Sequence, residues 1–507
     1  MPTGMPLRYI GAGLAVWLFA GIVACTPSDD SSTPVPGPLG VEGRRGPFEE
    51  PSRPNFVFIL IDTLRADHLG AYGYPRDTTP FIDSLAANGL LFESAVSQAP
   101  WTGASMASIW TSRFPSEVGA GVLPDESGQR WLGKSDSTEL RTDVPTVAEV
   151  LGGVGYRSMA LVSNSYAAEA FGLLRGYDVT RKEWMDAGDL TKEAISLLAE
   201  HHHTASLAGH GPGSGKPFFL YIHYIDVHEP TFPPEEYRQR FPASDGEAHG
   251  KKHSRWNYGY DYDPEDPDFQ SFREHKIGLY DAALRYIDDQ IQYLAGYLES
   301  KGLLDRTVFI IASDHGEEFW DHKEFERNFH LDPRGLSGVG HGQSLFGELT
   351  DVPLIISGPN VPSGRISKVV RNIDLVPTMY ALAGVDTSDL KLHGIDLIDF
   401  AQRSEPFDLD AVSESISYGV EAKSIQRGRW KLIRYFDTKG DQKEFLYNRE
   451  LDAAEQTDLF LKESEIAAQL GAALDVELAE MERGPRGAKT ELDDQMRTLL
   501  KAIGYIE

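Results

Sequence analysis

Polar residues that could bind a metal ion follow apolar, strand-like runs in this chain. Asp62 follows the run Phe56 to Ile61, and Asp314 and His315 come after the run Thr307 to Ala312. Short apolar runs rich in β-branched and aromatic residues are typical of strands buried on both faces of a sheet. In open α/β sheets, ligands bind beyond the carboxyl ends of such strands. We therefore expect these three side chains to meet at one site.

A candidate nucleophile, Thr102, lies between Pro100-Trp101 and a run of small residues that can begin a helix. The first turn of a helix offers free backbone N–H groups and the positive end of the helix dipole, which suit an anionic ester. A divalent cation can hold a threonine hydroxyl as the alkoxide without a general base. Asp62, Asp314 and His315 would complete the ligand set of one such ion. Two carboxylates and one imidazole favour Zn²⁺ or Mn²⁺, with Ca²⁺ or Mg²⁺ as alternatives.

Two further histidines could act on the substrate. Phe218 to Ile225 is a third strand-like run and leads to His228, and His341 comes later in a glycine-rich stretch. We predict that His228 and His341 contact the ester oxygens or protonate the leaving group. Arg65 is a weaker candidate for the same task. The sequence leaves open whether His223, inside the strand-like run, reaches the site.

Three other polar segments are less closely tied to chemistry. The histidines of His201 to Lys216 are predicted to lie in a solvated loop, and His322 and His330 are predicted to be solvated in an acidic loop. Thr231 to Phe269 is rich in Pro, Tyr and Asp and has little periodicity. Such a long irregular segment beside a strand end favours a lid or a wall of a substrate site.

Strand-like runs alternate with amphipathic helical segments from residue 54 onward. This order predicts an α/β fold with a mostly parallel central sheet flanked by helices, over residues 54–397. Residues 398–507 are predicted to form a small C-terminal α+β subdomain. Its expected elements are strands at Lys423–Arg427, Trp430–Tyr435 and Glu444–Tyr447 and a helix at Ser464–Glu482. A long helix is expected earlier in the chain, at Phe272–Ser300.

Residues 1–25 are typical of a signal peptide. Ile10 to Ala24 is apolar but short for a membrane span, and Ile22-Val23-Ala24-Cys25 resembles the lipobox of bacterial lipoproteins. On this interpretation Cys25, the only cysteine, carries the lipid anchor of an exported cell-envelope protein, periplasmic or at the cell surface. An uncleaved anchor is the alternative. Residues 26–53 are expected to be a disordered linker.

The formal net charge of −29 argues against a nucleic-acid partner. An anionic ester substrate must therefore be attracted locally, by a metal ion or by Arg and His at the site. Local charge outweighs net charge at contact distance, so this substrate class remains open.

These stretches together resemble the sulfatase family of the alkaline phosphatase superfamily. The matching segments follow the family's order over about residues 54 to 460: PNFVFILIDTLRADHLGAYG, APWTGASMASIWTSRFP, FFLYIHYIDVHEP, YDAALRYIDDQI, TVFIIASDHGEE, GHGQSLFGELTDVPLIISGP, RNIDLVPTMYALAGV and WKLIRYF. The resemblance implies an α/β core with a small C-terminal sheet domain and a bound divalent metal ion. It also implies hydrolysis or transfer of sulfuryl or phosphoryl groups.

The chain departs from the family's pattern at the nucleophile. Sulfatases carry a Cys or Ser that becomes formylglycine, whereas Thr102 cannot form this aldehyde because its β-carbon bears a methyl group. Met106 replaces the Arg of that motif, and no counterpart of the family's Lys-Trp-His segment is found near Asn164. Asp62-Thr63 and Asp314-His315 stand where the family has Asp-Asp and Asp-Asn. This set is similar to relatives with a threonine nucleophile, which are phosphodiesterases and phosphoglycerol or phosphoethanolamine transferases.

Three functions follow as alternatives. The first is an exported, metal-dependent hydrolase that works through Thr102 on a phosphoester. The second is a sulfuric ester hydrolase, and the third is a catalytically inactive protein that binds glycans or lipid head groups. Two-metal relatives use an Asp and a His spaced by three residues plus a later His. Asp226, His228 and His341 offer this set with a gap of one residue, so a second metal ion is the less favoured alternative.

Overall fold

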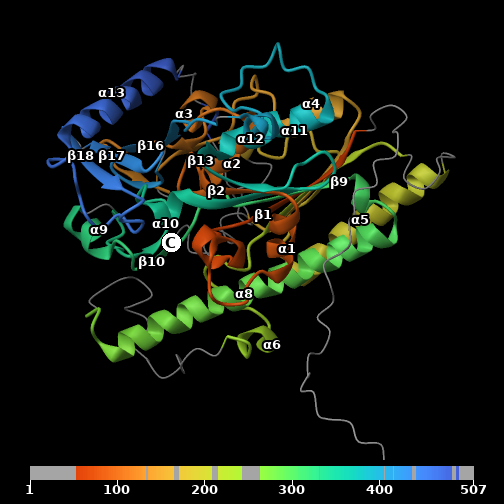
Figure 1. The fold of residues 1–507 in the computed structure, drawn as a ribbon, viewed down its shortest axis with the longest axis horizontal. Helices are drawn as coiled ribbons and strands as arrows, with labels where there is room; N and C mark the ends of the chain where they lie inside the picture. The colour runs from red at the N-terminus through yellow and green to blue at the C-terminus, as the bar shows by residue number, and fades with distance from the viewer. Residues whose placement is uncertain are drawn as a thin grey trace, which may run out of the picture. The chain divides into compact units, whose positions relative to one another are not determined.

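The computed structural model describes residues 53–132, 135–164, 171–207, 215–241, 263–329, 332–404, 406–414, 416–436, 441–481 and 487–489. Within these ranges one large sheet has the strand order β13-β2-β12-β9-β1-β8-β6-β7 (Figure 1). Its strands are β1 (Asn55–Ile61), β2 (Leu90–Val96), β6 (Arg157–Val162), β7 (Val179–Arg181), β8 (Phe218–Tyr224), β9 (Thr307–Ala312), β12 (Asp351–Ser357) and β13 (Gly364–Arg371). The run from β9 to β7 is parallel, and β12 is antiparallel to both β9 and β2. The predicted mostly parallel sheet is confirmed.

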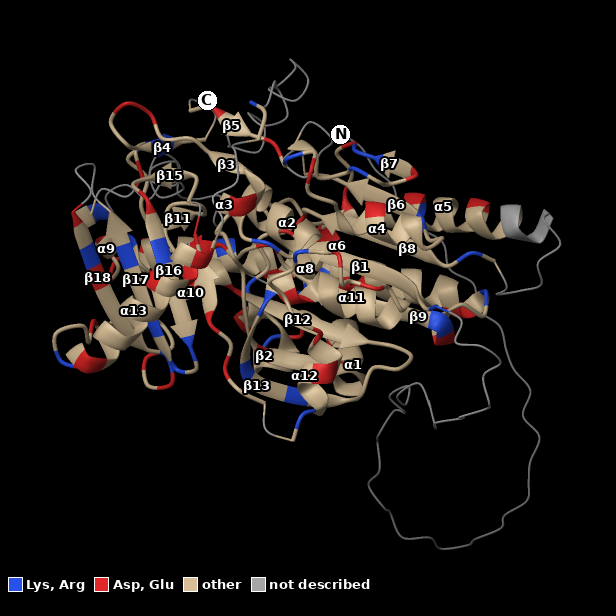
Figure 2. Cartoon of the chain, turned by 90° about the horizontal axis from the view of Figure 1, so that it is seen from above, with Lys and Arg blue, Asp and Glu red and all other residues tan. Residues whose placement is uncertain are grey.

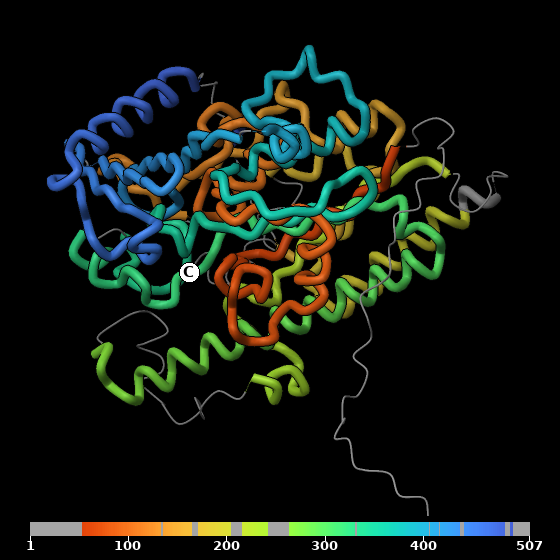
Figure 3. Tube along the Cα trace, in the orientation of Figure 1, coloured from red at the N-terminus to blue at the C-terminus, as the bar shows by residue number. Residues whose placement is uncertain are grey.

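Helices cover both faces of this sheet, as Figures 1 and 3 show. One face packs against α2 (Thr102–Thr111), α4 (Val147–Gly153), α11 (Leu375–Ala383) and α12 (Leu397–Gln402). The other packs against α1 (Pro80–Asn88), α5 (Ala187–Leu207) and α8 (Pro267–Ser300). In β1, Phe56, Phe58 and Leu60 point to the first face and Val57, Ile59 and Ile61 to the second. A strand buried on both sides must be apolar throughout, which explains the continuous runs in the sequence.

A smaller antiparallel sheet follows in the chain, seen with α13 at one end of the view in Figure 2. It consists of β14 (Ala411–Ser413), β16 (Ala422–Arg427), β17 (Trp430–Phe436) and β18 (Gln442–Asn448). α13 (Ser464–Glu480) packs against β16 and β17, and its Leu470 and Leu474 share one apolar cluster with the side chains of this sheet. The predicted strands and helix of this region are confirmed.

Some sequence-based boundaries were wrong. His201 to His203 lie in α5, which continues to Leu207, because the Ala- and Leu-rich sequence before them sustains the helix beyond its apolar stripe. α8 begins at Pro267, since Asp266 caps it. Of the predicted irregular insertion, residues 231–241 contain the short helix α6 (Glu235–Arg238), and residues 242–262 lie outside the described ranges.

The predicted signal peptide and linker, residues 1–52, also lie outside the described part of the chain. Among the helices that the structure describes, none has the length and apolar character needed to cross a membrane.

Candidate active site

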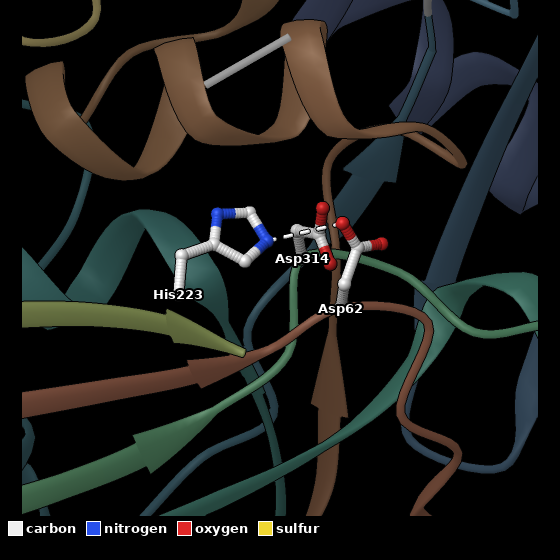
Figure 4. Close-up of side chains that lie close together, drawn as sticks. All are labelled: Asp62, His223 and Asp314. Carbon is white, nitrogen blue, oxygen red and sulfur yellow. Dashed lines mark hydrogen bonds and ion pairs between the residues drawn. The ribbon is translucent and has the colours of Figure 1, made fainter. Parts of the chain in front are cut away.

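Four polar side chains continue the face of the sheet that packs against α2. His223 is in register with Leu60 and Val162, which point to that face. Asp62, Asn164 and Asp314 each lie two residues beyond a strand residue of the same orientation: Leu60, Val162 and Ala312. Because side chains alternate along a strand, all four polar groups point toward the beginning of α2. Figure 4 shows Asp62, His223 and Asp314 directed toward one another.

Serine hydroxyls fix the loops that carry these groups. Ser105, in the first turn of α2, donates a hydrogen bond to the Asp314 carbonyl oxygen at 2.7 Å, and Ser97 donates to the same oxygen at 2.5 Å. Ser313 donates to the Ile61 carbonyl oxygen at 2.8 Å. The helix that begins at Thr102 and the ends of β1 and β9 are therefore joined at the site itself.

Thr102 is the first residue of α2 and is fully buried. Its Oγ1 lies 3.2 Å from Nε2 of His315 and 3.2 Å from Nδ2 of Asn164. Asn164 Nδ2 also donates a short hydrogen bond to Oδ2 of Asp62. Trp101 packs over the start of the helix so closely that a Cβ on Gly103 would lie 2.4 Å from its ring. The hydroxyl is thus held in one place, next to an imidazole and an amide donor.

The carboxylates leave two oxygens free for a cation. Oδ1 of Asp62 and Oδ2 of Asp314 are buried and accept no hydrogen bond, which is costly for a carboxylate. Nε2 of His315 lies 3.6 Å from the first oxygen and 3.4 Å from the second. His315 Nε2 and Thr102 Oγ1 thus lie near two buried carboxylates that could bind a divalent metal ion, and the three-ligand cluster that the described residues form with these carboxylates contains His223.

His223 joins the same cluster. Its Nε2 lies 3.0 Å from Oδ2 of Asp62, and its Nδ1 lies 2.8 Å from the Tyr221 hydroxyl. Burial raises the pKa of Tyr221 well above its usual range, so the phenol is neutral and can donate to Nδ1. Nε2 then carries the proton and donates to Asp62 while no cation is bound; loss of that proton would leave Nε2 free to bind a metal ion. Asp62, His223 and Asp314 each offer one ligand atom, and these three atoms lie within 4.8 Å of one another.

Charge at the site is unbalanced without a cation. Burial opposes ionisation of Asp62, but the hydrogen bond and charge of His223 hold the pKa of Asp62 well below its ordinary value. Burial and the neighbouring charge of Asp62 raise the pKa of Asp314. Two adjacent buried carboxylates repel each other, and a divalent cation would remove that repulsion.

His341 lies beside His315, and His228 lies beside His341. The ring centre of His341 is 4.3 Å from that of His315 and 5.1 Å from that of His228. His228 Nδ1 is 2.5 Å from the Glu229 carbonyl oxygen, while His341 Nδ1 is 3.3 Å from Oε2 of Glu317. Burial lowers the pKa of His341, and the neighbouring imidazoles lower it further. Burial raises the pKa of Glu317 to about 7.

The alternative second metal site is not formed in the described part of the chain. Asp226 turns away to accept a hydrogen bond at 2.9 Å from the backbone N–H of Ala187, at the start of α5. Asp226, His228 and His341 therefore do not form a three-ligand cluster; the one such cluster among the described residues is Asp62, His223 and Asp314. The direction of Asp226 follows from its position directly after β8, where a carboxylate can cap a helix.

Two further predictions need correction. The Arg65 guanidinium is occupied by ion pairs with Asp67 and Asp321, both at 2.8 Å, and by the Glu317 carbonyl oxygen, so it holds the loop after β9 rather than a substrate oxygen. His322 is buried, not solvated: it is paired with Glu348 and stacked on Phe346. His330 lies outside the described residues.

Asn164 and Glu317 are not among the site residues predicted from the sequence, and His223 is left open there. A signal was available for two of them. Counting in twos from the apolar residues of β6 and β8 places Asn164 and His223 on the face of Asp62 once the neighbouring strands are taken as parallel and in register. Glu317 reaches His341 through a loop, for which no such periodicity exists.

The model of the family described as Sulfatase matches residues 54–385. The chain belongs to the sulfatase family. Relatives include the Δ4,5-hexuronate-2-O-sulfatase of Bacteroides thetaiotaomicron, 22% identical over 88% of this chain and 93% of the relative. Human arylsulfatase A is 27% identical over 68% of this chain and 67% of the human protein.

Solved structures share the fold. A structure with bound D-glucosamine-2-N,6-O-disulfate as substrate superposes with a TM-score of 0.66 at 18% identity, covering 85% of this chain and 98% of that one. The phosphonate monoester hydrolase of Agrobacterium radiobacter superposes with a TM-score of 0.63 at 17% identity, covering 87% and 99%. Family membership makes this protein an ester hydrolase of a metal-dependent family, and its buried Asp, His and Asp cluster could bind the metal.

Proposed function

We propose that this protein hydrolyses or transfers a phosphoester through Thr102. The observation that carries the proposal is the convergence of Thr102 Oγ1, His315 Nε2 and the two free carboxylate oxygens of Asp62 and Asp314. A divalent ion bound there, with Zn²⁺ or Mn²⁺ favoured for a mixed nitrogen and oxygen set, would supply a threonine alkoxide at neutral pH. Without the ion, an ester would meet only the neutral hydroxyl of Thr102.

The chain's own groups complete the chemistry. Asn164 Nδ2 donates to Thr102 Oγ1 and stabilises negative charge on it. The N–H groups of the first turn of α2 lie next to Thr102 and are suited to the oxygens of the transferred group. We assign contact with the ester and its leaving oxygen to His228 and His341, and the support is that their rings adjoin each other and His315. Transfer to Thr102 expels an alcohol, and water then releases the group from Thr102.

Charge favours a singly charged ester. Two carboxylates, the Thr102 alkoxide and one divalent ion together carry one net negative charge. Cations around the site are already paired with carboxylates: Arg65 with Asp321, Lys276 with Glu229 and Arg334 with Asp332. A phosphodiester or a sulfate ester carries one negative charge, whereas a phosphate monoester carries about two. Thr102 in place of a formylglycine precursor supports the phosphodiester.

A sulfuric ester hydrolase is the second candidate, and the names of the relatives favour it. The third candidate is an inactive binding protein, which differs from the other two in that it turns over no ester. Purified protein of known metal content should be assayed with an aryl phosphodiester, an aryl phosphate monoester and an aryl sulfate. We expect the highest kcat/KM for the phosphodiester; preference for the sulfate would overturn the leading candidate, and no turnover with no bound metal would favour the binding protein.

Thr102→Ala tests the nucleophile. We expect it to abolish turnover and to leave unfolding unchanged within about 1 kcal/mol, since the residue does not cap α2 with its side chain. Ser108→Ala is the matched control, because Ser108 is a buried hydroxyl of the same helix whose Oγ makes no hydrogen bond. Turnover by Thr102→Ala at the wild-type rate would remove Thr102 from its role.

We propose further that the protein is exported and anchored to the cell envelope by a lipid on Cys25. The support is the apolar run and the lipobox-like residues that precede Cys25. Cys25→Ser should move the protein from the membrane fraction to the soluble fraction and abolish labelling by a radioactive fatty acid. Unchanged fractionation and unchanged labelling would contradict the anchor.

A further inference from the structure

Four buried side chains away from the active-site ligands each keep an oxygen atom that makes no hydrogen bond. They lie on β10 (Glu318–Phe319), on α9 (Lys323–Phe329), in the loop after β11 (Val339–Gly340) and on β17. The atoms are Oε2 of Glu318, Oε1 of Glu326, Oε1 of Gln343 and Oη of Tyr435, and the residues are 2%, 1%, 1% and 5% exposed. Buried polar atoms without a partner are costly, so a group of them indicates a ligand.

Contacts with β11 bring three of these side chains to one short stretch of backbone. Glu318 belongs to β10, which pairs with β11. Oε2 of Glu326 accepts from the backbone N–H of Gly338 at 2.7 Å, and Nε2 of Gln343 donates to the Val339 carbonyl oxygen at 3.3 Å. The carboxylates of β10 and α9 and the amide of the following loop therefore gather around β11.

The electrostatic effects among these groups confirm that they are close. Burial raises the pKa of Glu318 well above its usual range, and the charge of Glu326 raises it further. Burial also raises the pKa of Glu326 to about 8, although the Gly338 N–H and the Gln343 side chain lower it. The two glutamates thus repel each other when both are ionised, and the Gln343 amide lies beside one of them.

Tyr435 brings the small sheet to the same place. The ring of Phe325, the residue before Glu326, has its centre 5.8 Å from that of Tyr435 and 4.9 Å from that of Phe445. Figures 1 and 2 show α9 beside β17 and β18. Burial raises the pKa of Tyr435 well above its usual range, and the charges of Tyr447 and Glu326 raise it further. Its hydroxyl is therefore neutral and can donate a hydrogen bond toward Glu326 or a nearby water.

Glu318 and Glu326 differ from the carboxylates around them in having no basic partner. Three neighbours are compensated: Glu348 by His322, Asp332 by Arg334 and Asp321 by Arg65. Within the described residues, Glu318 and Glu326 form no ion pair, and each accepts from a backbone N–H with its other oxygen. A protonated carboxyl group would need an acceptor and an ionised one needs a cation, and this part of the chain supplies neither to the two free oxygens.

We propose that Glu318, Glu326 and Gln343 bind a divalent cation of their own, separate from the ion of the active site, and that this cation is Ca²⁺. Two carboxylates and one amide carbonyl offer only oxygen ligands, which Ca²⁺ prefers, and water can complete its shell of about six to eight ligands. The two positive charges of the ion match the two glutamates. The ion joins β10, α9 and the loop after β11 beside the small sheet, so it stabilises the fold and takes no part in the reaction.

Calcium titration of chelator-treated protein tests this site. Asp314→Asn weakens binding at the active site, so Ca²⁺ that this variant still binds reports on Glu318, Glu326 and Gln343. We expect one Ca²⁺ per chain by calorimetry and a higher Tm in its presence. Adding Glu326→Gln should raise the Kd of that ion at least tenfold and remove the rise in Tm. No Ca²⁺ binding by Asp314→Asn, or an unchanged Kd in the double variant, would overturn the proposal and leave water between these side chains.

Glu324→Gln, also made in the Asp314→Asn protein, is the matched control. Glu324 lies on the same helix, but it is exposed and paired with Arg327 at the surface. It removes the same charge and should leave the Kd unchanged; an equal loss in Glu324→Gln would refute a specific site. If Glu326→Gln fails to fold, Gln343→Leu takes its place with the same tenfold loss expected. None of these measurements uses turnover, so the site stands or falls independently of the proposed function.

Discussion

Removing the amide of Asn164 should slow the chemistry without releasing the metal. Asn164 is 1% exposed and donates from Nδ2 both to Thr102 Oγ1, at 3.2 Å, and to Oδ2 of Asp62. A hydrogen bond to an ionised group is worth about 1.5–3 kcal/mol. Because about 1.4 kcal/mol corresponds to a factor of ten, Asn164→Ala should lower kcat/KM by roughly 10- to 150-fold.

Asn55→Ala is the control for this experiment. Asn55 is a buried asparagine at the opposite end of β1, where its side chain accepts from the backbone N–H of Phe218 at 3.2 Å and donates to Thr307 Oγ1. It should lower stability and leave kcat/KM unchanged. The assay is hydrolysis of an aryl phosphodiester, with the metal content of each variant measured in parallel. The reasoning about Asn164 is refuted if its variant keeps the wild-type rate, or if the rate falls only because the metal is lost.

Other consequences can be measured separately. Asp314→Asn removes one of the two free carboxylate oxygens and should lower the affinity for the divalent ion at least tenfold, as seen by titration into chelator-treated protein; unchanged affinity would contradict its role as a ligand. Burial lowers the pKa of His322, but the charge of Glu348 outweighs this effect and raises the pKa from 6.5 to about 9. The pair therefore stabilises the fold fully below pH 6.5. This stabilisation, roughly 3 kcal/mol at most, is lost as pH rises through 9. Urea unfolding at pH 6 and pH 9.5 should therefore show a smaller pH dependence for His322→Gln than for wild type, and equal dependence would refute the assignment. Leu474→Ala empties a fully buried position between α13 and the small sheet and should cost about 2–5 kcal/mol in the same assay, whereas a loss below about 1 kcal/mol would contradict the packing described.

The sheet could be predicted because its central strands are buried on both faces. β1, β8 and β9 are almost entirely apolar, which marks each strand and its carboxyl end in the sequence. Asp62 and Asp314 follow directly from that reading. The antiparallel placement of β12 between β9 and β2 could not be read, because an apolar run carries no direction.

The remaining parts of the site depend on contacts that the sequence does not encode locally. The direction of Asp226 toward α5 and the burial of His322 beside Glu348 arise from packing between distant segments. The pairing of His341 with Glu317 depends on two loops whose shape is set by glycines and by neighbouring carbonyl oxygens. His223 and Asn164 were within reach of a periodicity argument that combined several strands.

The central claim is that one divalent ion lies between Asp62, Asp314, His315 and Thr102. A crystal structure of the purified protein, with anomalous diffraction recorded at the absorption edge of the metal found in it, tests this claim most directly. We predict one strong peak among these four side chains, at about 2.0–2.2 Å from the ligand atoms for Zn²⁺. A protein that is active with this position empty, or with its metal bound elsewhere, would contradict the account.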